Sequence, residues 1–393
     1  MQPSTVDIQI NISIRGLRMI LLKTWRSAAF GVYGYLNFTK AAYLEHSKRY
    51  NPEDMQTKIE GKNCVVTGAN SGIGYATAEG LASRGANVYM VCRSKERGEA
   101  ARSKIQSMTG NENVYLELVI FLKRLIKFSS QVCDLSSVNE IKSFTSRFTS
   151  KDVPIHVLVN NAGLLEHNRI TTSEGTRHEL NFAVNVLGTY TMTELMLPLL
   201  EKAAPDSRVI TVSSGGMYTT PLTEDLQVHG LVYFSSAACL LQFSSTLWNF
   251  SLFVLLQFSH GNFDGVEQYA RNKRIQIALT EKWAETYKDK GIGFYSMHPG
   301  WAETPGVANS LPGFSKSLSG KLRTSEQGAD TVIWLALMRK EKLLSGAFYF
   351  DRVEAPKHLK FAATGGSHAA AMDSIINNLR SLSSLSSYNE TQQ

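Results

Sequence analysis

The chain has 393 residues, of which 43% are hydrophobic and 19% charged, a composition that suits a globular protein with a sizeable core. The 41 basic and 34 acidic residues give a net charge of +7, but no basic stripe interleaved with aromatic residues indicates a nucleic-acid partner. The four cysteines form no Cys-x-x-Cys pair and no metal-ligand spacing, so the sequence predicts neither a disulfide scaffold nor a metal site.

Residues 1–60 form a basic N-terminal extension in which no acidic side chain lies between Asp7 and Glu45. Its purely apolar stretch 19–22 is too short to span a bilayer. A basic amphipathic segment of this kind is typical of a transit peptide, of a helix on a membrane surface, or of a helix packed on the edge of a domain. All three interpretations stay open, so the segment leaves mitochondrial import and peripheral membrane contact as alternatives for an intracellular protein.

From residue 61 onward, short apolar β-branched runs alternate with longer amphipathic runs, which predicts a parallel sheet covered by helices. The expected strands are 63–67, 87–92, 114–116, 156–159, 208–212, 293–297 and 347–350. The expected helices are 73–83, 96–108, 138–148, 176–202, 269–288 and 325–338. This order predicts one Rossmann-type, doubly wound α/β domain over 61–351. A C-terminal extension, 352–393, follows, and its Ser-rich end from Ser381 is expected to be disordered.

A glycine-rich turn, TGANSGIG at residues 67–74, separates the first strand from the first helix of this domain. Gly68 permits the tight turn, Gly72 lets a phosphate approach the backbone, and Gly74 allows the helix to pack closely on the strand. Backbone N–H groups at such a helix start can surround a pyrophosphate. The expected dinucleotide contacts in this turn are Thr67, Gly68, Asn70, Ser71, Gly72, Ile73 and Gly74.

Arg93 follows the second strand, where the residue type separates two cofactors. A carboxylate there would accept the ribose hydroxyls of NAD(H), whereas a guanidinium suits the 2′-phosphate of NADP(H). Arg93 therefore favours NADP(H) over NAD(H), with an ordinary surface arginine as the alternative. After the third strand, Asp134 and Leu135 precede a helix, where an Asp is also a plain N-cap residue.

Two asparagine positions mark the middle of the domain. The fourth strand ends in Asn-Asn-Ala-Gly at 160–163, which by itself is only a turn sequence. Asn185 lies inside an apolar helical run, where a polar side chain needs a partner. A functional asparagine and a satisfied core asparagine both fit that position.

The second half of the domain contains a serine, a tyrosine and a lysine at positions that suit ligand binding and acid–base catalysis. The fifth strand runs into a Ser-Ser pair that ends at Ser214, at the carboxyl end of the sheet, where open α/β folds bind ligands. Tyr269 and Lys273 are four positions apart and share one helix face. A lysine cation near a phenol favours the phenolate, which suits general acid–base catalysis near neutral pH. The sixth strand is followed by HPGWAET at 298–304, in which we expect His298 to be structural.

Together, the G-x-x-x-G-x-G spacing and these later motifs resemble the short-chain dehydrogenase/reductase superfamily over about residues 60–350. The resemblance implies an NADP(H)-dependent oxidoreductase that transfers hydride between nicotinamide and a small-molecule carbonyl or alcohol. It implies that Tyr269 is the general acid/base and that Lys273 lowers the tyrosine pKa and holds the nicotinamide ribose. It also implies that Ser214 orients the substrate oxygen and that Asn185 bends its helix and anchors a water leading to the lysine.

The same resemblance implies the remaining cofactor contacts, with the adenine at the Asp-Leu pair and the carboxamide at the loop after the sixth strand. They are Asp134, Leu135, Asn161, Ala162, Gly163, Tyr269, Lys273, Pro299, Gly300 and Thr304. Family members commonly dimerise through the helices that lie here at 176–202 and 269–288, so the resemblance also implies a homodimer. The apolar residues Met217, Tyr218, Trp301 and Phe314 favour a lipophilic substrate such as a retinoid, a steroid or an aldehyde.

Two apolar segments, 116–131 and 231–260, interrupt the family pattern. The second contains no Asp, Glu, Lys or Arg, and it places Tyr269 55 positions after Ser214, a far longer connection than the family's usual one. The segments are either genuine substrate-lid or membrane-contacting elements, or a splice or gene-model product, and their lack of a helical or strand period favours the second explanation. In that case the alternative function is a catalytically impaired NADP(H)-binding protein that acts by interaction.

Overall fold

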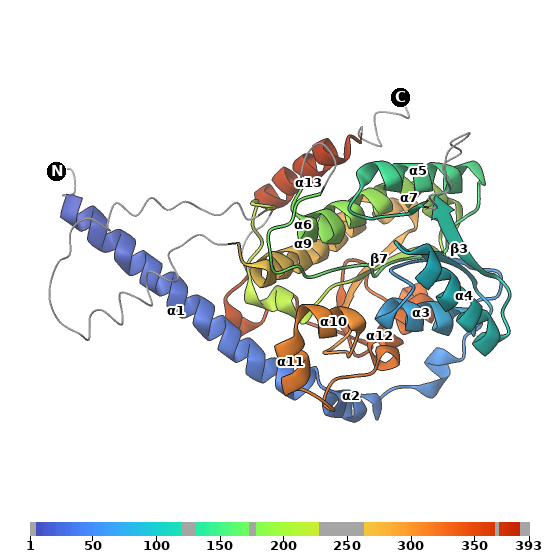
Figure 1. Ribbon diagram of the computed structural model, residues 1–393, viewed down its shortest axis with the longest axis horizontal. Coiled ribbons are helices and arrows are strands. Elements are labelled where there is room, and N and C mark those ends of the chain that lie inside the picture. Colours follow the sequence, from blue (N-terminus) through green and yellow to red (C-terminus); the bar gives the residue numbers. More distant parts are fainter. Residues whose placement is uncertain (1–4, 120–130, 173–177, 228–262, 366–368, 386–393) are drawn as a thin grey trace.

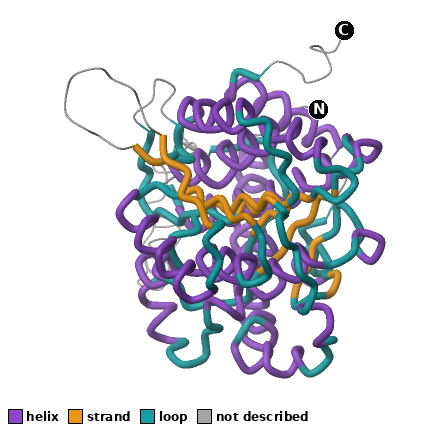
Figure 2. The backbone as a smooth tube through the Cα atoms, turned by 90° about the vertical axis from the view of Figure 1, so that its right-hand side faces the viewer, coloured by secondary structure: helices purple, strands orange, loops and turns teal. Residues whose placement is uncertain are grey.

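A computed structural model of the chain describes residues 5–119, 131–172, 178–227, 263–365 and 369–385. Within these residues the strands form one nine-stranded sheet in the order β4-β3-β2-β1-β5-β6-β7-β8-β9. Neighbouring strands from β3 to β8 run parallel, and the edge strands β4 and β9 pair antiparallel. Figure 2 shows the sheet as the middle layer between two layers of helices. The predicted Rossmann-type, doubly wound fold is therefore confirmed.

The labels of Figure 1 correspond to the following segments. The strands are β1 (Asn63–Thr67), β2 (Asn87–Val91), β3 (Val114–Val119), β4 (Gln131–Val132), β5 (Val157–Asn160), β6 (Arg208–Val212), β7 (Gly293–His298), β8 (Phe348–Phe350) and β9 (Val353–Glu354). The helices are α1 (Thr5–Asn37), α2 (Lys40–Ser47), α3 (Gly72–Ala82), α4 (Lys95–Thr109), α5 (Val138–Ser150), α6 (Leu180–Phe182), α7 (Thr189–Lys202), α9 (Gly265–Thr286), α10 (Pro305–Ser310), α11 (Pro312–Ser317), α12 (Ser325–Leu337) and α13 (Ala369–Ser383). A π-helical segment, Ala183–Gly188, joins α6 to α7.

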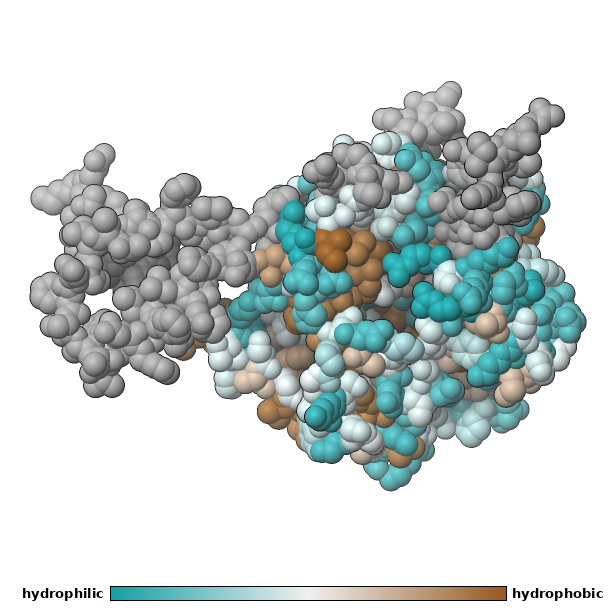
Figure 3. Space-filling model, viewed as in Figure 1, coloured by the Kyte–Doolittle hydropathy of each residue, from teal (hydrophilic) through white to brown (hydrophobic). Residues whose placement is uncertain are grey.

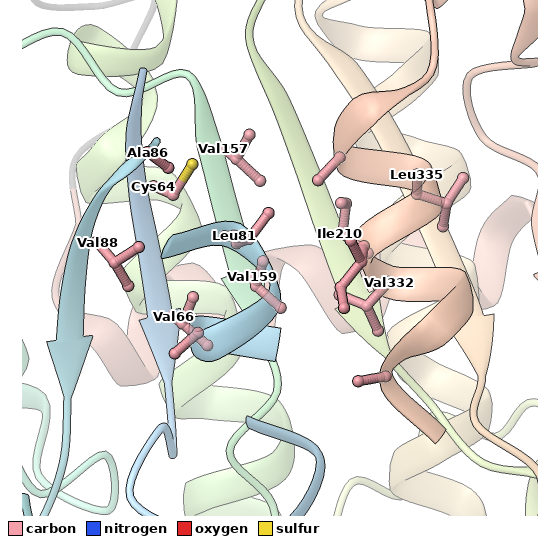
Figure 4. Close-up of a cluster of buried hydrophobic side chains, with 14 of the residues drawn as sticks. Cys64, Val66, Leu81, Ala86, Val88, Val157, Val159, Ile210, Val332 and Leu335 are labelled. Atoms are coloured by element: carbon pink, nitrogen blue, oxygen red, sulfur yellow. The ribbon is translucent and has the colours of Figure 1, made fainter. Parts of the chain in front are cut away.

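Two apolar clusters attach the helices to the sheet. On one face, α3 and α12 pack on the central strands through buried side chains. Figure 4 shows Val66 of β1 and Val159 of β5 beside Leu81 of α3. Val332 and Leu335 of α12 lie farther along the sheet. A second cluster, drawn mainly from α5, α7 and α9, covers the opposite face. Strands that are buried on both faces read as continuous apolar runs, which is why the sequence pattern located them.

The order of the strands fixes where a ligand can bind. In β1, Val65 is paired with Tyr89 of β2 on one side and with Leu158 of β5 on the other, so the chain reverses its winding direction at β1. The connections after β1 and β5 therefore leave from opposite faces, and a crevice opens at the carboxyl ends of these strands. The glycine-rich turn and the loops after β5, β6 and β7 all lie at this edge.

Several boundaries differ from the sequence expectation. The helix expected over 176–202 begins in the described residues at Leu180 and is interrupted by the π-helical segment, while residues 173–177 lie outside them. Helix α9 begins four residues before Tyr269, because Asp264 Oδ1 accepts the N–H groups of Val266 and Glu267, each at 3.0 Å. Strand β3 is longer than expected and pairs with β4. Residues 120–130 and 228–262, which hold most of the two unusual segments, lie outside the described residues.

Helix α13 is an element that the sequence pattern did not predict. It buries Met372, Ile375 and Leu379 against the second apolar cluster and packs on α9 and on the π-helical segment. It extends to Ser383, so the Ser-rich region expected to be disordered from Ser381 is helical over its first residues, and 386–393 lie outside the described part. Because α13 covers part of α9, it also covers part of the surface that the family resemblance assigns to a dimer.

The N-terminal extension is held by a buried ion pair at the end of α1. Arg323 bonds Asp351 through Nη1 at 2.5 Å and Nη2 at 2.9 Å, and its Nε donates to the carbonyl of Phe38 at 3.0 Å. Figure 1 shows the C-terminal end of α1 against the domain and its other end extending past it. Over the described residues, none of the helices has the length and apolarity needed to cross a bilayer.

Candidate active site

A pocket of about 1050 Å³ lies at the carboxyl ends of the central strands. Figure 3 shows this side of the molecule hollowed near its centre, with hydrophobic surface beside the hollow. Its wall contains members of most motifs that the sequence singled out: the glycine-rich turn, Arg93, Asp134, the 161–163 turn, Ser214, Tyr269, Lys273 and the 298–304 loop. Asn185 is not part of this wall. The structure therefore brings together at one pocket residues, such as Gly68 and Thr304, that lie more than two hundred positions apart in the chain.

The glycine-rich turn has the shape of a phosphate cradle. Gly68 and Gly72 have positive φ angles of 68° and 55°, which L side chains rarely adopt. A Cβ at Gly74 would overlap the Gly68 carbonyl oxygen, so only glycine permits this packing. Ser71 at the N-cap of α3 makes no side-chain cap hydrogen bond, which leaves the first N–H groups of that helix available. These features fit an anionic pyrophosphate, the group that a dinucleotide would place there.

The carboxyl ends of β1 and β5 are tied together beside this cradle. Thr67 Oγ1 accepts the N–H groups of Asn161 and Ala162, each at 3.0 Å, and Asn161 Nδ2 donates to the Thr67 carbonyl at 2.8 Å. The Asn-Asn-Ala-Gly motif is thus more than a turn, because it fixes the width of the crevice next to the glycines.

The residues expected at the adenosine end lie around the far side of the cradle. Arg93 is exposed and lines the pocket, as does its neighbour Arg97. The carboxylate of Asp134 accepts the N–H of Ser136 at 2.9 Å, while the cap of α5 is made by Ser137, which accepts the N–H of Glu140 at 3.1 Å. The plain N-cap interpretation of Asp134 is therefore wrong, and its side chain belongs to the pocket wall.

Tyr269, Lys273 and Ser214 converge where α9 passes the end of β6. Lys273 Nζ lies 5.4 Å from the centroid of the Tyr269 ring. Burial raises the pKa of the Tyr269 phenol, and its interaction with the Ser214 hydroxyl lowers that pKa to a smaller degree. Burial lowers the pKa of Lys273 to about 7. The lysine ammonium donates to the carbonyl of Val212 at 2.9 Å and to Gln276 Oε1 at 3.1 Å.

Asn185 occupies the π-helical segment, a local widening that is frequent at functional sites. Its side chain clamps the loop after β5: Oδ1 accepts the N–H of Leu164 at 2.9 Å and Nδ2 donates to the Leu164 carbonyl at 2.8 Å. Its own main-chain carbonyl accepts Gln276 Nε2 at 2.6 Å. Asn185 is thus a satisfied buried side chain that also shapes the pocket, so the two interpretations of this position are compatible.

The loop after β7 closes the other end of the pocket. Gly300 has a φ of 77°, and a Cβ there would overlap the Arg323 side chain. Thr304 lines the pocket and also caps α10, since its Oγ1 accepts the N–H of Val307 at 3.2 Å. His298 is buried, its Nδ1 accepts the N–H of Gly215 at 3.0 Å, and it also lines the pocket.

The substrate side differs from the sequence expectation in two respects. Trp301 and Phe314 line the pocket, but Met217 and Tyr218 are buried in a third apolar cluster, because the short 3₁₀ turn that contains them directs both side chains into the core. The sequence also missed a contribution from the N-terminal helix. Lys23, Arg26, Ser27 and Phe30 of α1 all lie in the pocket wall.

Lys23 connects α1 to α9 at the rim. Its Nζ donates to Glu267 Oε2 at 2.6 Å, and Glu267 in turn accepts Arg271 at 2.8 Å. Phe30 packs edge-on against Trp301, with ring centroids 6.4 Å apart. The basic character of the extension was visible in the sequence, but a single sequence gives no sign of which loop a remote helix will meet.

The fold and the contents of the pocket define a Rossmann-type nucleotide-binding oxidoreductase. The sequence model of the family described as "short chain dehydrogenase" matches residues 62–248. Dehydrogenase/reductase SDR family member 12 of Bos taurus is 39% identical to the chain over 346 residues, which cover 88% of this chain and 94% of the bovine protein. The chain belongs to the short-chain dehydrogenase/reductase family.

Other proteins that are similar to the chain are also named as dehydrogenases or reductases. Retinol dehydrogenase 11 of Homo sapiens is 33% identical over 298 residues, covering 75% of this chain and 78% of the human protein. Among solved structures, an L-sorbose reductase from Gluconobacter frateurii in complex with NADPH and L-sorbose has a TM-score of 0.51 at 18% identity, covering 75% of this chain and 96% of that one. A putative NAD(P)-dependent gluconate 5-dehydrogenase from Beutenbergia cavernae with bound NADP has the same TM-score at 20% identity, covering 74% and 95%. At these identities the solved structures confirm the fold alone.

The lowered pKa of Lys273 predicts a pH-dependent stability of the cofactor-free protein. Between about 7 and the ordinary value of 10.5, the unfolded chain binds a proton that the folded protein does not, so the free energy of unfolding rises with pH across this window. The slope is at most about 1.4 kcal/mol per pH unit. Lys273→Met removes this group, so its stability gain over wild type, measured by denaturant unfolding, is expected to be largest near pH 7 and to shrink towards pH 10. A gain that does not change with pH would contradict the assignment.

Proposed function

We propose that the protein is an NADP(H)-dependent oxidoreductase that transfers hydride between nicotinamide and the carbonyl or alcohol carbon of a lipophilic small molecule. The observation that carries this proposal is the convergence of Ser214, Tyr269 and Lys273 at one end of the pocket whose other end is the glycine cradle. Although 55 positions separate them in the chain, Ser214 and Tyr269 lie in the same pocket wall, close enough for the serine to lower the tyrosine pKa. This proximity weighs against the alternative of a catalytically impaired binding protein.

In the direction of reduction, each side chain has a defined task. The nicotinamide, when bound, supplies the hydride. Ser214 donates a hydrogen bond to the substrate carbonyl oxygen, and Tyr269 gives that oxygen its phenolic proton as negative charge develops there. The Lys273 ammonium stabilises the phenolate that remains. In the direction of oxidation the same groups act in reverse, with the phenolate as the base.

The preference for NADP(H) rests on Arg93 and Arg97 at the adenosine end of the pocket. A 2′-phosphate would gain charge-assisted hydrogen bonds from a guanidinium, and NADH has no group to use them. We therefore expect Arg93→Ala to weaken NADPH binding by about tenfold, one such hydrogen bond, and to leave NADH binding nearly unchanged. Fluorescence titration of both cofactors measures this. Arg102 lies on α4, the helix that follows Arg93, and is paired with Glu99 at 2.7 Å, so it provides the control variant Arg102→Ala. Equal losses for the two cofactors would refute the assignment.

A lipophilic substrate is supported by the aromatic groups at the substrate end. Trp301 meets Phe314 edge-on at 5.2 Å between ring centroids, and Phe30 of α1 completes the wall. Relatives of the chain include proteins named retinol dehydrogenases, which places a retinoid-like aldehyde or alcohol among the candidates. The test is NADPH oxidation by the purified full chain with a panel that runs from short polar aldehydes to long apolar ones. We expect kcat/KM to rise with apolar length, whereas NADPH binding without turnover across the panel would favour the impaired alternative.

We also propose that α1 makes peripheral membrane contact through one exposed apolar stripe. Four side chains with spacings of 4, 7 and 4 positions share one helix face: Leu21, Trp25, Val32 and Leu36, which are 60%, 57%, 64% and 67% exposed. An exposed apolar face with a Trp on a basic helix is typical of a helix that lies in the membrane interface. The face opposite carries Lys23 and Phe30 of the pocket wall, so a membrane-bound α1 would bring the pocket near the lipid.

The stripe predicts a specific result with anionic lipid vesicles. The double variant Val32→Glu, Leu36→Glu is expected to lose most of its cosedimentation, because two apolar side chains are withdrawn from the lipid and two negative charges are added. Met108→Glu, at a 68% exposed apolar side chain on α4, is the control and should behave as wild type. Unchanged cosedimentation of the double variant would exclude the stripe as the contact.

The homodimer remains a separate proposal, and α13 already covers part of its expected surface.

A further inference from the structure

Gln276 links two residues of the candidate active site from inside the core. It lies one turn after Lys273 on α9 and its side chain is 1% exposed. Its Oε1 accepts Lys273 Nζ at 3.1 Å, and its Nε2 donates to the main-chain carbonyl of Asn185 at 2.6 Å. Both ends of the amide are therefore engaged with the proposed catalytic machinery.

The orientation of this amide follows from its partners. A protonated lysine donates only and a main-chain carbonyl accepts only, so the oxygen must face Lys273 and the nitrogen must face Asn185. No flipped arrangement satisfies both contacts. The carbonyl of Asn185 belongs to the π-helical segment, so the amide connects the lysine to the part of the helix that departs from regular α geometry.

We propose that Gln276 is a positioning residue that holds the Lys273 ammonium beside Tyr269 by bridging it to the carbonyl of Asn185. This inference rests on the proposed function. Lysine has a flexible side chain, and with Val212 as its remaining protein acceptor the ammonium would be held on one side only. A second acceptor fixed at both ends defines where the charge lies relative to the phenol. The preorganised placement of charge is what stabilises a phenolate without reorganisation during the reaction.

Two substitutions separate positioning from packing. Gln276→Met keeps nearly the same volume but offers no oxygen acceptor and no N–H donor. Gln276→Ala leaves a polar space into which a water can enter and bridge Lys273 and Asn185. If Gln276 positions Lys273, kcat should be highest with Gln, lower with Ala and lowest with Met, with a loss of up to about 100-fold for Met. Packing predicts the reverse order for the two variants, since Met fills the core better than Ala.

Gln268 supplies a matched control on the same helix. It is also buried, and its Nε2 donates to the carbonyl of Leu226 at 2.9 Å and to Asn272 Oδ1 at 2.8 Å, with no contact to Lys273. Gln268→Met should lower the melting temperature to a similar degree as Gln276→Met but leave kcat and its pH profile unchanged. Gln276→Met should move the pH profile of kcat towards lower pH, because the ammonium loses an acceptor that favours the charged form.

A readout without turnover keeps the proposal independent of the enzyme assay. The rate at which a small amine-reactive reagent labels Lys273 in the cofactor-free protein, followed by peptide mass spectrometry across pH, reports the fraction of neutral amine. We expect its midpoint to fall in Gln276→Met and to stay in place in Gln268→Met. An unchanged midpoint together with wild-type kcat in Gln276→Met would overturn the inference. If wild type turns over no substrate, the proposed function fails, but the labelling midpoints still decide the role of Gln276.

Discussion

Replacing Tyr269 with Phe is expected to lower kcat for carbonyl reduction by about 10²–10⁴-fold, the contribution typical of a positioned general acid. The substitution removes only the hydroxyl, whose pKa the neighbouring Ser214 lowers, and leaves the ring beside Lys273. NADPH affinity should therefore change little, since the glycine cradle and Arg93 are untouched. Steady-state kinetics with a substrate found in the aldehyde panel, together with fluorescence titration of NADPH, measures both quantities.

Tyr287→Phe is the matched control for this variant. Tyr287 caps the C-terminus of the same helix, and its hydroxyl is bonded to Glu194 at 3.3 Å, away from the pocket. Loss of that bond should cost about 1 kcal/mol of stability and leave kcat unchanged. Wild-type turnover in Tyr269→Phe would remove the tyrosine from the mechanism, whatever the control shows.

Replacing Gly74 with Ala is expected to weaken NADPH binding by at least tenfold and to lower the free energy of unfolding by about 1–3 kcal/mol. The added Cβ would overlap the Gly68 carbonyl oxygen and the Asn161 side-chain amide, so the turn must open. Opening the turn displaces the N–H groups that surround the pyrophosphate. Isothermal titration and denaturant unfolding measure the two effects.

Gly313→Ala tests whether any glycine substitution in a helix has these consequences. A Cβ at Gly313 of α11 would have no atom within 4 Å, so NADPH affinity and stability should remain close to wild type. If Gly74→Ala bound NADPH as tightly as Gly313→Ala, the turn could not be the phosphate site.

The central fold was predictable because its signals are local. Strand β1 and the glycine-rich turn are read from a buried apolar run followed by residues whose conformation only glycine adopts easily. The boundaries that failed had signals in the sequence that were overlooked. Asp264 starts α9 before Tyr269 by capping it, and it is followed by Glu267 three positions later, a pattern typical of a helix start. In α13, Met372, Ile375 and Leu379 recur at helical spacing and pack on the second apolar cluster.

The site was predicted on its cofactor side and incompletely on its substrate side. The glycine-rich turn, Arg93, the 161–163 turn, Ser214 and the 298–304 loop follow parallel strands, so the topology collects them at one edge of the sheet. Phe30 and Lys23 reach the pocket only because Arg323 and Asp351 hold the end of α1 across the domain. Met217 and Tyr218 lie in the core and not in the pocket, because the short 3₁₀ turn that contains them directs their side chains inward. Gln276 was not visible as a site residue, since its role depends on the π-helical carbonyl that it meets.

The most direct test of the proposed function follows the hydride itself. The purified full chain is incubated with an apolar aldehyde and NADPH that carries deuterium at both C4 positions of the nicotinamide, and the alcohol product is analysed by mass spectrometry. Hydride transfer at this site predicts one deuterium in the product with wild type and with Tyr287→Phe, and a trace at most with Tyr269→Phe. Tight binding of NADPH with no deuterated product from any aldehyde of the panel would contradict the assignment of the pocket as a reductase site.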